Sequence, residues 1–455
     1  MSVQIRADAA SSTPSAAVGA AAAADPRRSR LPALDVLRGV AILGTLLTNI
    51  WIFSGVRTSM AANGPNQTQS VPELVFQQVL NLTTDGKYIG LLTIMFGIGL
   101  EIQRQAAIRR GQPWPGGYPW RAGLLILDGL LNYIFIFEHD VLMGYGLTGL
   151  VVAIVLAGSP RTQKVWMGIG LAAHLAHLAY LSWDVWGTNS EALEGQRGMV
   201  VERGRDALVE RPDLAEALGA AGAQADRLLD RGAQAGLGAD GGSNDTASYW
   251  DMVIGRVSEF WGGRGEIPIM FTMGLGLFLV GAQLYRAGLF APEGGRLRRR
   301  VMIGAFGVGL PIDAIARLFF HETLSLYTRY LTSALVSFGL LAAIAAFYAH
   351  GRQPRWLGRP FQLVGRMALT CYILQNLICS LIFYDFGLGL ANRFPEHTTV
   401  MTMIVYVLVC AMLVTLSWAW LRRWSRGPVE LVWHWSYEAI MRRVRRRPSA
   451  RTATL

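Results

Sequence analysis

The chain has 455 residues, of which 52% are hydrophobic and only 16% are charged, and its formal net charge is +11. Together with a mean hydropathy of +0.31, this composition excludes an ordinary soluble domain. We therefore predict an all-α bundle that crosses a membrane several times. The three cysteines form no CxxC and no Cys/His pattern, so neither a disulfide nor a metal site is predicted.

Residues 1–30 are rich in Ala and Ser and show no hydrophobic period. We expect them to form a disordered leader. No small-residue cleavage site follows a short apolar core, so the first apolar segment is expected to stay in place as an anchor.

Apolar segments of about 20 residues, the length that one bilayer crossing requires, recur ten times after the leader. In an N-terminal half (31–186) they lie near 34–54, 88–104, 121–137, 141–158 and 165–186. In a C-terminal half (251–427) they lie near 266–287, 301–320, 330–349, 362–383 and 400–421. These segments predict about ten transmembrane helices, the third and fourth separated only by Glu138-His139-Asp140.

Arginine and lysine are concentrated in alternate loops, and short basic loops are typical of the cytoplasmic side. Basic residues precede the first segment, follow the tenth, and fill the loops after the second, fourth, sixth and eighth. This alternation predicts that both termini are cytoplasmic. The net charge of +11 is thereby explained by topology, and no nucleic-acid partner is expected.

Two hydrophilic regions complete the predicted organisation. Residues 187–250 carry eleven acidic residues and six arginines, and we expect an external helical insertion, either without chemistry or serving as a lid over an outward-facing cavity. The tail, residues 428–455, combines tryptophans with a run of arginines. It is predicted to form a basic amphipathic helix on the cytoplasmic surface of anionic lipid.

The first apolar segment opens with an acid and an arginine one helical turn apart, Asp35 and Arg38. A charge inside a bilayer helix costs about 2.5–3.5 kcal/mol on insertion scales, so the pair is a candidate site. Asn49 shares their helical face. Two interpretations stay open: the charges neutralise each other or reach lipid headgroups, or they bind an acyl-CoA phosphate or a substrate carboxylate.

Four segments occur in order: 34–39 (LDVLRG) continuing to Asn49-Ile50, 86–88 (GKY) with 95–99 (MFGIG), 365–375 (GRMALTCYILQ) and 427–430 (GPVE). With this set the chain resembles the YeiB-like bacterial membrane family, catalogued as domain of unknown function 418. The resemblance covers nearly the whole chain after residue 30. It implies a multi-pass protein of the bacterial inner membrane, but the family has no settled activity.

A more distant resemblance concerns chemistry. The opening LDVLRG segment is similar to the first helix of transmembrane acyltransferases, which pass acyl groups from cytoplasmic acyl-CoA to acceptors across the membrane. In the acyltransferase-3 type an arginine is followed, with ten residues between them, by a histidine. Here Arg38 is followed at that spacing by Asn49. An amide is not a general base near neutral pH, so the histidine-dependent mechanism does not transfer to this position.

The third apolar segment departs from the family in the same direction. A family Gly-Leu-x-His pattern appears as 129–132 (GLLN), so Asn132 stands in place of the histidine. The family's next Gly-Asp-Ile-Leu pattern begins here with His139-Asp140, which puts an imidazole next to a carboxylate. We take His139, Asp140 and the intramembrane Asp128 as candidates for proton transfer. Asn49 and Asn132 have the alternative role of hydrogen bonding between helices.

Further polar residues are candidates for substrate binding. Lys87 precedes the second segment on the outer side, as an interface anchor or an anion ligand. Asp313 and Arg317 form a polar stripe on the seventh segment, either as a self-neutralised ladder or as a cavity wall. On the ninth segment the candidates are Arg366, Tyr372 and Gln375.

Two function classes remain open. The first is a membrane acyltransferase that takes acyl-CoA as donor, gripped by Arg38, and modifies an envelope glycan or lipid. The second is a transporter or small-molecule-binding membrane protein in which the same polar stripes line a path. Membrane lipids are the expected partners, and no cofactor is firmly indicated.

Overall fold

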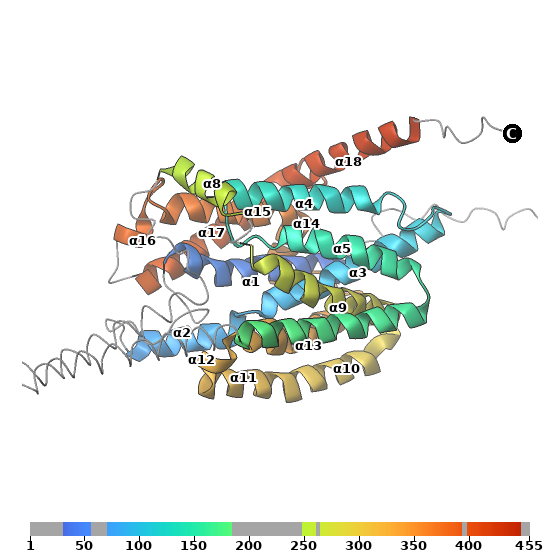
Figure 1. The fold of residues 1–455 in the computed structure, drawn as a ribbon, viewed down its shortest axis with the longest axis horizontal. Helices are drawn as coiled ribbons and strands as arrows, with labels where there is room; N and C mark the ends of the chain where they lie inside the picture. Colours follow the sequence, from blue (N-terminus) through green and yellow to red (C-terminus); the bar gives the residue numbers. More distant parts are fainter. Residues whose placement is uncertain (1–30, 56–70, 184–247, 261–263, 394–397, 447–455) are drawn as a thin grey trace, which may run out of the picture.

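The computed structural model describes residues 31–55, 71–183, 248–260, 264–393 and 398–446. Within these ranges every regular element is helical, as predicted. Most helices run side by side along the longest axis of the molecule, and the short helices α2, α8, α12 and α16 gather at one end (Figure 1). The predicted leader, positions 187–247 of the predicted insertion and the last nine residues of the tail lie outside the described residues.

The N-terminal half contains six described helices. They are α1 (Pro32–Phe53), α2 (Val71–Thr84), α3 (Lys87–Arg109), α4 (Tyr118–Phe135), α5 (Leu142–Ala157) and a helix over Pro160–Trp183. α1 begins at a proline, whose fixed φ suits the first helical turn. α2 lies in a stretch for which the sequence predicted no helix.

The C-terminal half begins with α8 (Tyr249–Ser258) and α9 (Glu266–Arg286). Two helical stretches follow, each with a π-helical turn inside it. The first comprises η1 (Pro292–Gly294), α10 (Gly295–Gly304), η2 (Ala305–Gly309) and α11 (Leu310–Phe319), and the second comprises α12 (His321–Tyr327), η3 (Thr328–Thr332) and α13 (Ser333–Tyr348). The rest comprises α14 (Gly358–Arg366), α15 (Ala368–Phe383), α16 (Leu390–Arg393), α17 (Thr398–Leu421) and α18 (Pro428–Arg446).

Each of the ten predicted apolar segments coincides with helix, but not all of these helices meet the criteria for a membrane span. In the described part of the chain six helices are long and apolar enough, or seven if the bent pair α14 and α15 counts as one span. α5 is apolar but has only 16 residues. Several apolar helices thus indicate a membrane protein, whereas ten spans and cytoplasmic termini stay predictions.

The glycine of the LDVLRG segment has a packing role. A Cβ atom at Gly39 would overlap the backbone carbonyl of Phe361 in α14, and one at Gly365 would overlap the carbonyl oxygen of Asp35. α1 and α14 therefore approach each other backbone to backbone, which only residues without a side chain permit. Gly97 of α3 meets the backbone of Phe278 in α9 in the same way.

The last family segment, 427–430, holds the bend between α14 and α15. The two helices are bent by 92° at Met367. The carboxylate of Glu430 accepts hydrogen bonds from the backbone N–H groups of Leu369 and Thr370, at 2.8 and 3.2 Å, and from the Thr370 hydroxyl. A carboxylate at a helix N-terminus satisfies free N–H groups and complements the helix dipole. α18 thereby caps α15 from outside.

Candidate functional site

A buried charge network lies where the turn between α2 and α3 meets α11 and η3. The Nζ atom of Lys87 is 2.6 Å from Oδ2 of Asp313, and Nε of Arg317 is 3.1 Å from the same oxygen. Arg317 also donates to Oδ2 of Asp85 at 2.8 Å, and Arg329 donates to Oδ1 of Asp85 at 3.1 Å. The structure thus brings together three predicted residues, Lys87, Asp313 and Arg317, with two that were not predicted.

Hydroxyl and carbonyl groups complete this network. Nη2 of Arg317 donates to the carbonyl oxygens of Asp85 and Thr328 and to the hydroxyl of Ser333, at 2.8–3.0 Å. The hydroxyl of Thr332 donates to Asp313. All three nitrogen atoms of the Arg317 guanidinium therefore donate hydrogen bonds. A buried charge needs such partners, because it has lost its hydration.

Asp85 sits in the turn before α3, and its charge is held by its neighbours. Burial alone would raise the pKa of the Asp85 carboxyl, but the guanidinium groups of Arg329 and Arg317 outweigh it and bring the pKa below its ordinary value of 3.8. The carboxylate is therefore ionised at neutral pH.

Arg329 projects from the π-helical turn η3. Single π-helical turns inside α-helices are frequent at functional sites, because the extra residue redirects side chains and leaves backbone carbonyls free. Here the carbonyl of Tyr330 lies 3.2 Å from Nε2 of His174 on the helix Pro160–Trp183. Arg329 also lies over the Tyr330 ring, 5.4 Å from its centroid.

A small polar cavity adjoins the network through Arg329. Its polar lining comes from Thr45, Asn49, His139, Glu266, Arg329, Tyr330 and Tyr372. The cavity volume is about 30 Å³, enough for one or two water molecules. Three of the sequence-predicted site residues, Asn49, His139 and Tyr372, thus meet in one place although they come from three distant segments.

His139 lies between two carboxylates at this cavity. Its Nδ1 atom is 3.7 Å from Glu138 and its Nε2 atom is 3.8 Å from Glu266. Three lining atoms are buried and have no hydrogen-bond partner in the structure: Nδ1 of His139, Oε2 of Glu266 and Nε of Arg329. A cavity with an imidazole, a carboxylate and a guanidinium that are not fully satisfied is suited to bind a polar group.

Asp140 is not the carboxylate placed beside His139. Its Oδ1 accepts the Leu142 N–H at 2.8 Å, and its Oδ2 accepts from the amide of Asn132 at 3.3 Å. Burial raises the pKa of Asp140 to about 7, although both hydrogen bonds and Arg264 oppose the rise. Asp140 and Asn132 thus form a buried hydrogen-bonded pair just before the start of α5. The catalytic role of Asp140 stays a prediction.

The other predicted residues lie away from this cavity. Asp35 and Arg38 form an ion pair of 3.5 Å, with the Arg38 side chain 41% exposed. Oδ2 of Asp128 and both polar atoms of Gln375 are buried and unpartnered, and Arg366 donates to the carbonyl of Ser425 at 3.5 Å. Their roles in binding or catalysis stay predictions.

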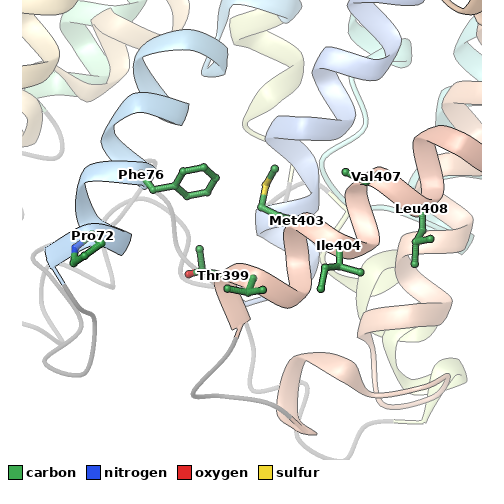
Figure 2. Close-up of a pocket in the computed structure, with 8 residues that line it drawn as sticks. Pro72, Phe76, Thr399, Met403, Ile404, Val407 and Leu408 are labelled. Atoms are coloured by element: carbon green, nitrogen blue, oxygen red, sulfur yellow. The ribbon is translucent and has the colours of Figure 1, made fainter.

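A second, wider groove in the described structure is apolar. It has a volume of about 570 Å³ and lies between α2 and α17, with Phe76 and Met403 on its two sides (Figure 2). Its lining offers almost no polar groups, so it contributes no chemistry.

Within the described ranges, no three His, Cys, Asp or Glu side chains lie close enough together to hold a metal ion.

Comparison with known proteins finds one family model and two bacterial relatives. Residues 284–438 match the model for the protein family of unknown function DUF418. The chain is 26% identical over 417 residues to the uncharacterized protein YxaH of Bacillus subtilis, covering 89% of this chain and 93% of that protein. It is also 26% identical over 421 residues to the uncharacterized protein YeiB of Escherichia coli, covering 88% and 94%. These matches support the predicted YeiB-like DUF418 family. No solved structure matches the chain.

Several residues of the network, the cavity and the helix cap were not predicted from the sequence. Asp85 directly precedes the 86–88 motif and Glu430 ends the 427–430 motif, so their positions beside these motifs mark both residues in the sequence. Arg329 and Glu266 stand near the ends of apolar segments. Charges in such places are usually interface anchors, and the sequence offers no signal that sets these two apart.

Proposed function

We propose that the protein is a membrane acyltransferase whose reaction takes place at the cavity between Asn49 and His139. The observation that carries the proposal is their joint presence in the cavity lining. The similar acyltransferases carry their histidine at the position of Asn49. Here an imidazole reaches the same space from the loop between α4 and α5.

His139 has the surroundings of a general base. An imidazole beside a carboxylate is oriented by it, and its cationic form is stabilised once it has accepted a proton. Glu266 lies 3.8 Å from Nε2, and Glu138 lies 3.7 Å from Nδ1. Either ring nitrogen can therefore face a substrate hydroxyl while the other faces a carboxylate.

The donor fits along α1. Arg38, half exposed beside Asp35, stands on the side predicted to be cytoplasmic, where acyl-CoA is found. It lies eleven residues from Asn49, which is about 16 Å along a helix. The extended pantetheine arm of coenzyme A bridges a distance of this order between its phosphates and its thioester. α1 is largely buried, so the donor enters only when the helices packed on it separate.

The reaction is an acyl transfer from a thioester to a hydroxyl. The acceptor oxygen attacks the thioester carbonyl carbon, and its proton passes to His139. The tetrahedral intermediate then collapses: the carbon–sulfur bond breaks and His139 returns the proton to the leaving sulfur. The products are the acylated acceptor and free coenzyme A.

The test uses full-length protein in lipid nanodiscs with labelled acetyl-CoA and a total envelope extract as acceptor. We expect label to appear in the extract with release of coenzyme A. Substituting His139→Gln should lower the rate by about 10²- to 10⁴-fold, as for loss of a general base. Arg38→Ala should weaken donor binding in calorimetry. Absence of both donor binding and transfer in the unsubstituted protein refutes the proposal.

One observation favours the second class, a transporter. Ionisable groups buried in a membrane protein commonly mark substrate or ion pathways, and the Lys87–Asp313–Arg317–Asp85 network is such a group. A transporter would accumulate a solute in proteoliposomes when a pH gradient is applied, with no consumption of acetyl-CoA. Acetyl transfer without any gradient would exclude this class.

A further inference from the structure

The buried network carries an excess of positive charge at one defined place. Among the described residues it contains three cations, Lys87, Arg317 and Arg329, and two carboxylates, Asp85 and Asp313. Lys87 is matched by Asp313, and Arg317 is shared by both carboxylates. Arg329 is paired with one oxygen of Asp85, the carboxylate that also serves Arg317, and its other partner is the uncharged side chain of Tyr330. The unbalanced charge is therefore that of Arg329.

That charge faces the cavity. Arg329 lines the same space as His139 and Glu266, and its Nε atom is buried without a hydrogen-bond partner. The carboxylate of Glu266 lies beside His139, 3.8 Å from its Nε2 atom. A guanidinium N–H that is desolvated but not used loses hydrogen-bond energy unless a ligand accepts from it.

We propose that Arg329 is a catalytic residue that holds the carbonyl oxygen of the acyl group during transfer. This inference rests on the proposed function. The cavity then has a fixed opposite charge for each charge that develops in the reaction. When the acceptor hydroxyl attacks, the carbonyl electron pair moves to oxygen beside Arg329, and the released proton makes His139 cationic beside Glu266. Preorganised groups of this kind are commonly the largest contribution to catalysis.

The network keeps Arg329 in place. A guanidinium on a flexible side chain stabilises an oxyanion only when its orientation is fixed beforehand. Asp85 holds one Nη atom of Arg329, and Arg317 fixes Asp85 through its side chain and its backbone carbonyl. Asp85 is thus a positioning residue: its effect on the reaction passes through Arg329.

Kinetics in nanodiscs give the first test. Arg329→Gln should lower kcat by about 10²- to 10³-fold, the range for loss of an oxyanion donor, with little change in KM for acetyl-CoA. Arg329→Lys keeps the positive charge but loses the planar set of guanidinium N–H donors, so its rate should lie between those of Arg329→Gln and the unsubstituted protein. Asp85→Asn should also lower kcat with KM unchanged. Arg286→Gln is the matched control and should stay active: Arg286 lies away from the cavity, bonded to Gln163 and paired with Glu101, and Glu101 keeps Arg104 as a second partner.

A second measurement does not depend on turnover. Acetate carries the oxygen arrangement of an acyl oxyanion, and it should raise the melting temperature of the unsubstituted protein more than chloride does at equal ionic strength. This difference should vanish in Arg329→Gln and persist in Arg286→Gln. Normal melting curves in the absence of acetate show that the variants are folded.

The outcomes separate this inference from the proposed function. If transfer occurs and requires His139 but proceeds at full rate in Arg329→Gln, the role of Arg329 is wrong and the acyltransferase proposal stands. If no transfer occurs but acetate stabilisation requires Arg329, the oxygen-binding site stands and the proposed reaction is wrong. Acetate stabilisation that is absent from the unsubstituted protein, or unchanged in Arg329→Gln, overturns the assignment of Arg329.

Discussion

At the scale of single residues, the position of one imidazole decides the chemistry we propose. His139 and Asn49 line one cavity from different parts of the chain. If the reaction needs one imidazole in this cavity, a histidine at position 49 or at position 139 is expected to supply it. In the proposed site the imidazole comes from the loop that follows α4, and the α1 position carries the amide of Asn49.

The exchange of these two residues tests this interpretation. We expect His139→Asn alone to lower acetyl transfer by about 10²- to 10⁴-fold. The double variant Asn49→His with His139→Asn should recover transfer to within roughly tenfold of the unsubstituted rate, because each amide and each imidazole again has a place in the cavity. A double variant no more active than the single one would show that the two positions are not equivalent.

A neighbouring residue predicts a pH dependence of stability. The pKa of Asp140 is 3.8 in an unfolded chain and about 7 in the folded protein. Between these values the folded protein holds a proton that the unfolded chain has released. Asp140 therefore makes stability fall as the pH rises from about 4 to about 7, by on the order of 4 kcal/mol, with no further change above.

The Asp140→Asn variant removes this titration. Its melting temperature should fall less between pH 5 and pH 7 than that of the unsubstituted protein, measured in the same detergent at matched ionic strength. Other titrating groups contribute equally to both proteins and cancel in the difference. Parallel curves would show that Asp140 is already ionised in the fold.

Some of the residues of this site were predicted from the sequence. Charges in mid-segment, such as Asp313 and Arg317, were recognised because burial in a membrane helix is costly. Lys87 was recognised from its motif. Their common network was beyond reach, since Lys87 and Asp313 are 226 residues apart and nothing in the spacing pairs them. Arg329 was missed because the π-helical turn that directs it into the cavity has no signature in the sequence.

At the scale of secondary-structure elements, the family motifs mainly form close contacts between helices. Gly39 and Gly365 let α1 and α14 touch, and Glu430 caps α15 from α18. Hydrophobic periodicity predicted nearly every long helix. It did not predict the 92° bend between α14 and α15, because the bend depends on a carboxylate supplied about 60 residues later.

Glycine substitutions test the close backbone contact between α1 and α14. Gly39→Ala should lower the melting temperature or the yield of folded protein, since its Cβ meets backbone that cannot rotate away; overpacking of this kind costs about 1–3 kcal/mol or more. Gly99→Ala on α3 is the matched control, because a Cβ there meets nothing within 4 Å. The control should be neutral or slightly stabilising. Equal behaviour of the two variants would contradict this packing.

The cap of α15 is tested in the same assay. Glu430→Ala leaves the N–H groups of Leu369 and Thr370 without their acceptor, and we expect a loss of about 1.5–3 kcal/mol, the range for a hydrogen bond to a charged group. Glu438→Ala removes an acid of the same helix whose partner is His434 at the surface. It should have little effect. A cap variant as stable as this control would show that the bend needs no carboxylate.

At the scale of the whole molecule, the proposed acyl transfer has a direction across the membrane. The basic loops predict that Arg38 faces the cytoplasm, and the cavity lies toward the other end of α1, near Asn49. The buried charges gather at that same end. An acyl group taken up beside Arg38 and transferred beside His139 therefore travels along α1 from the predicted cytoplasmic side toward the outside.

Sided proteoliposomes test this central claim most directly. Protein is inserted in one orientation, established by protease cleavage of the basic tail, and labelled acetyl-CoA is supplied on one side only. We predict transfer when the donor is on the side of the tail, no transfer from the opposite side, and loss of transfer in His139→Gln. Transfer of equal rate from both sides, or label that never leaves acetyl-CoA from either side, would contradict the account.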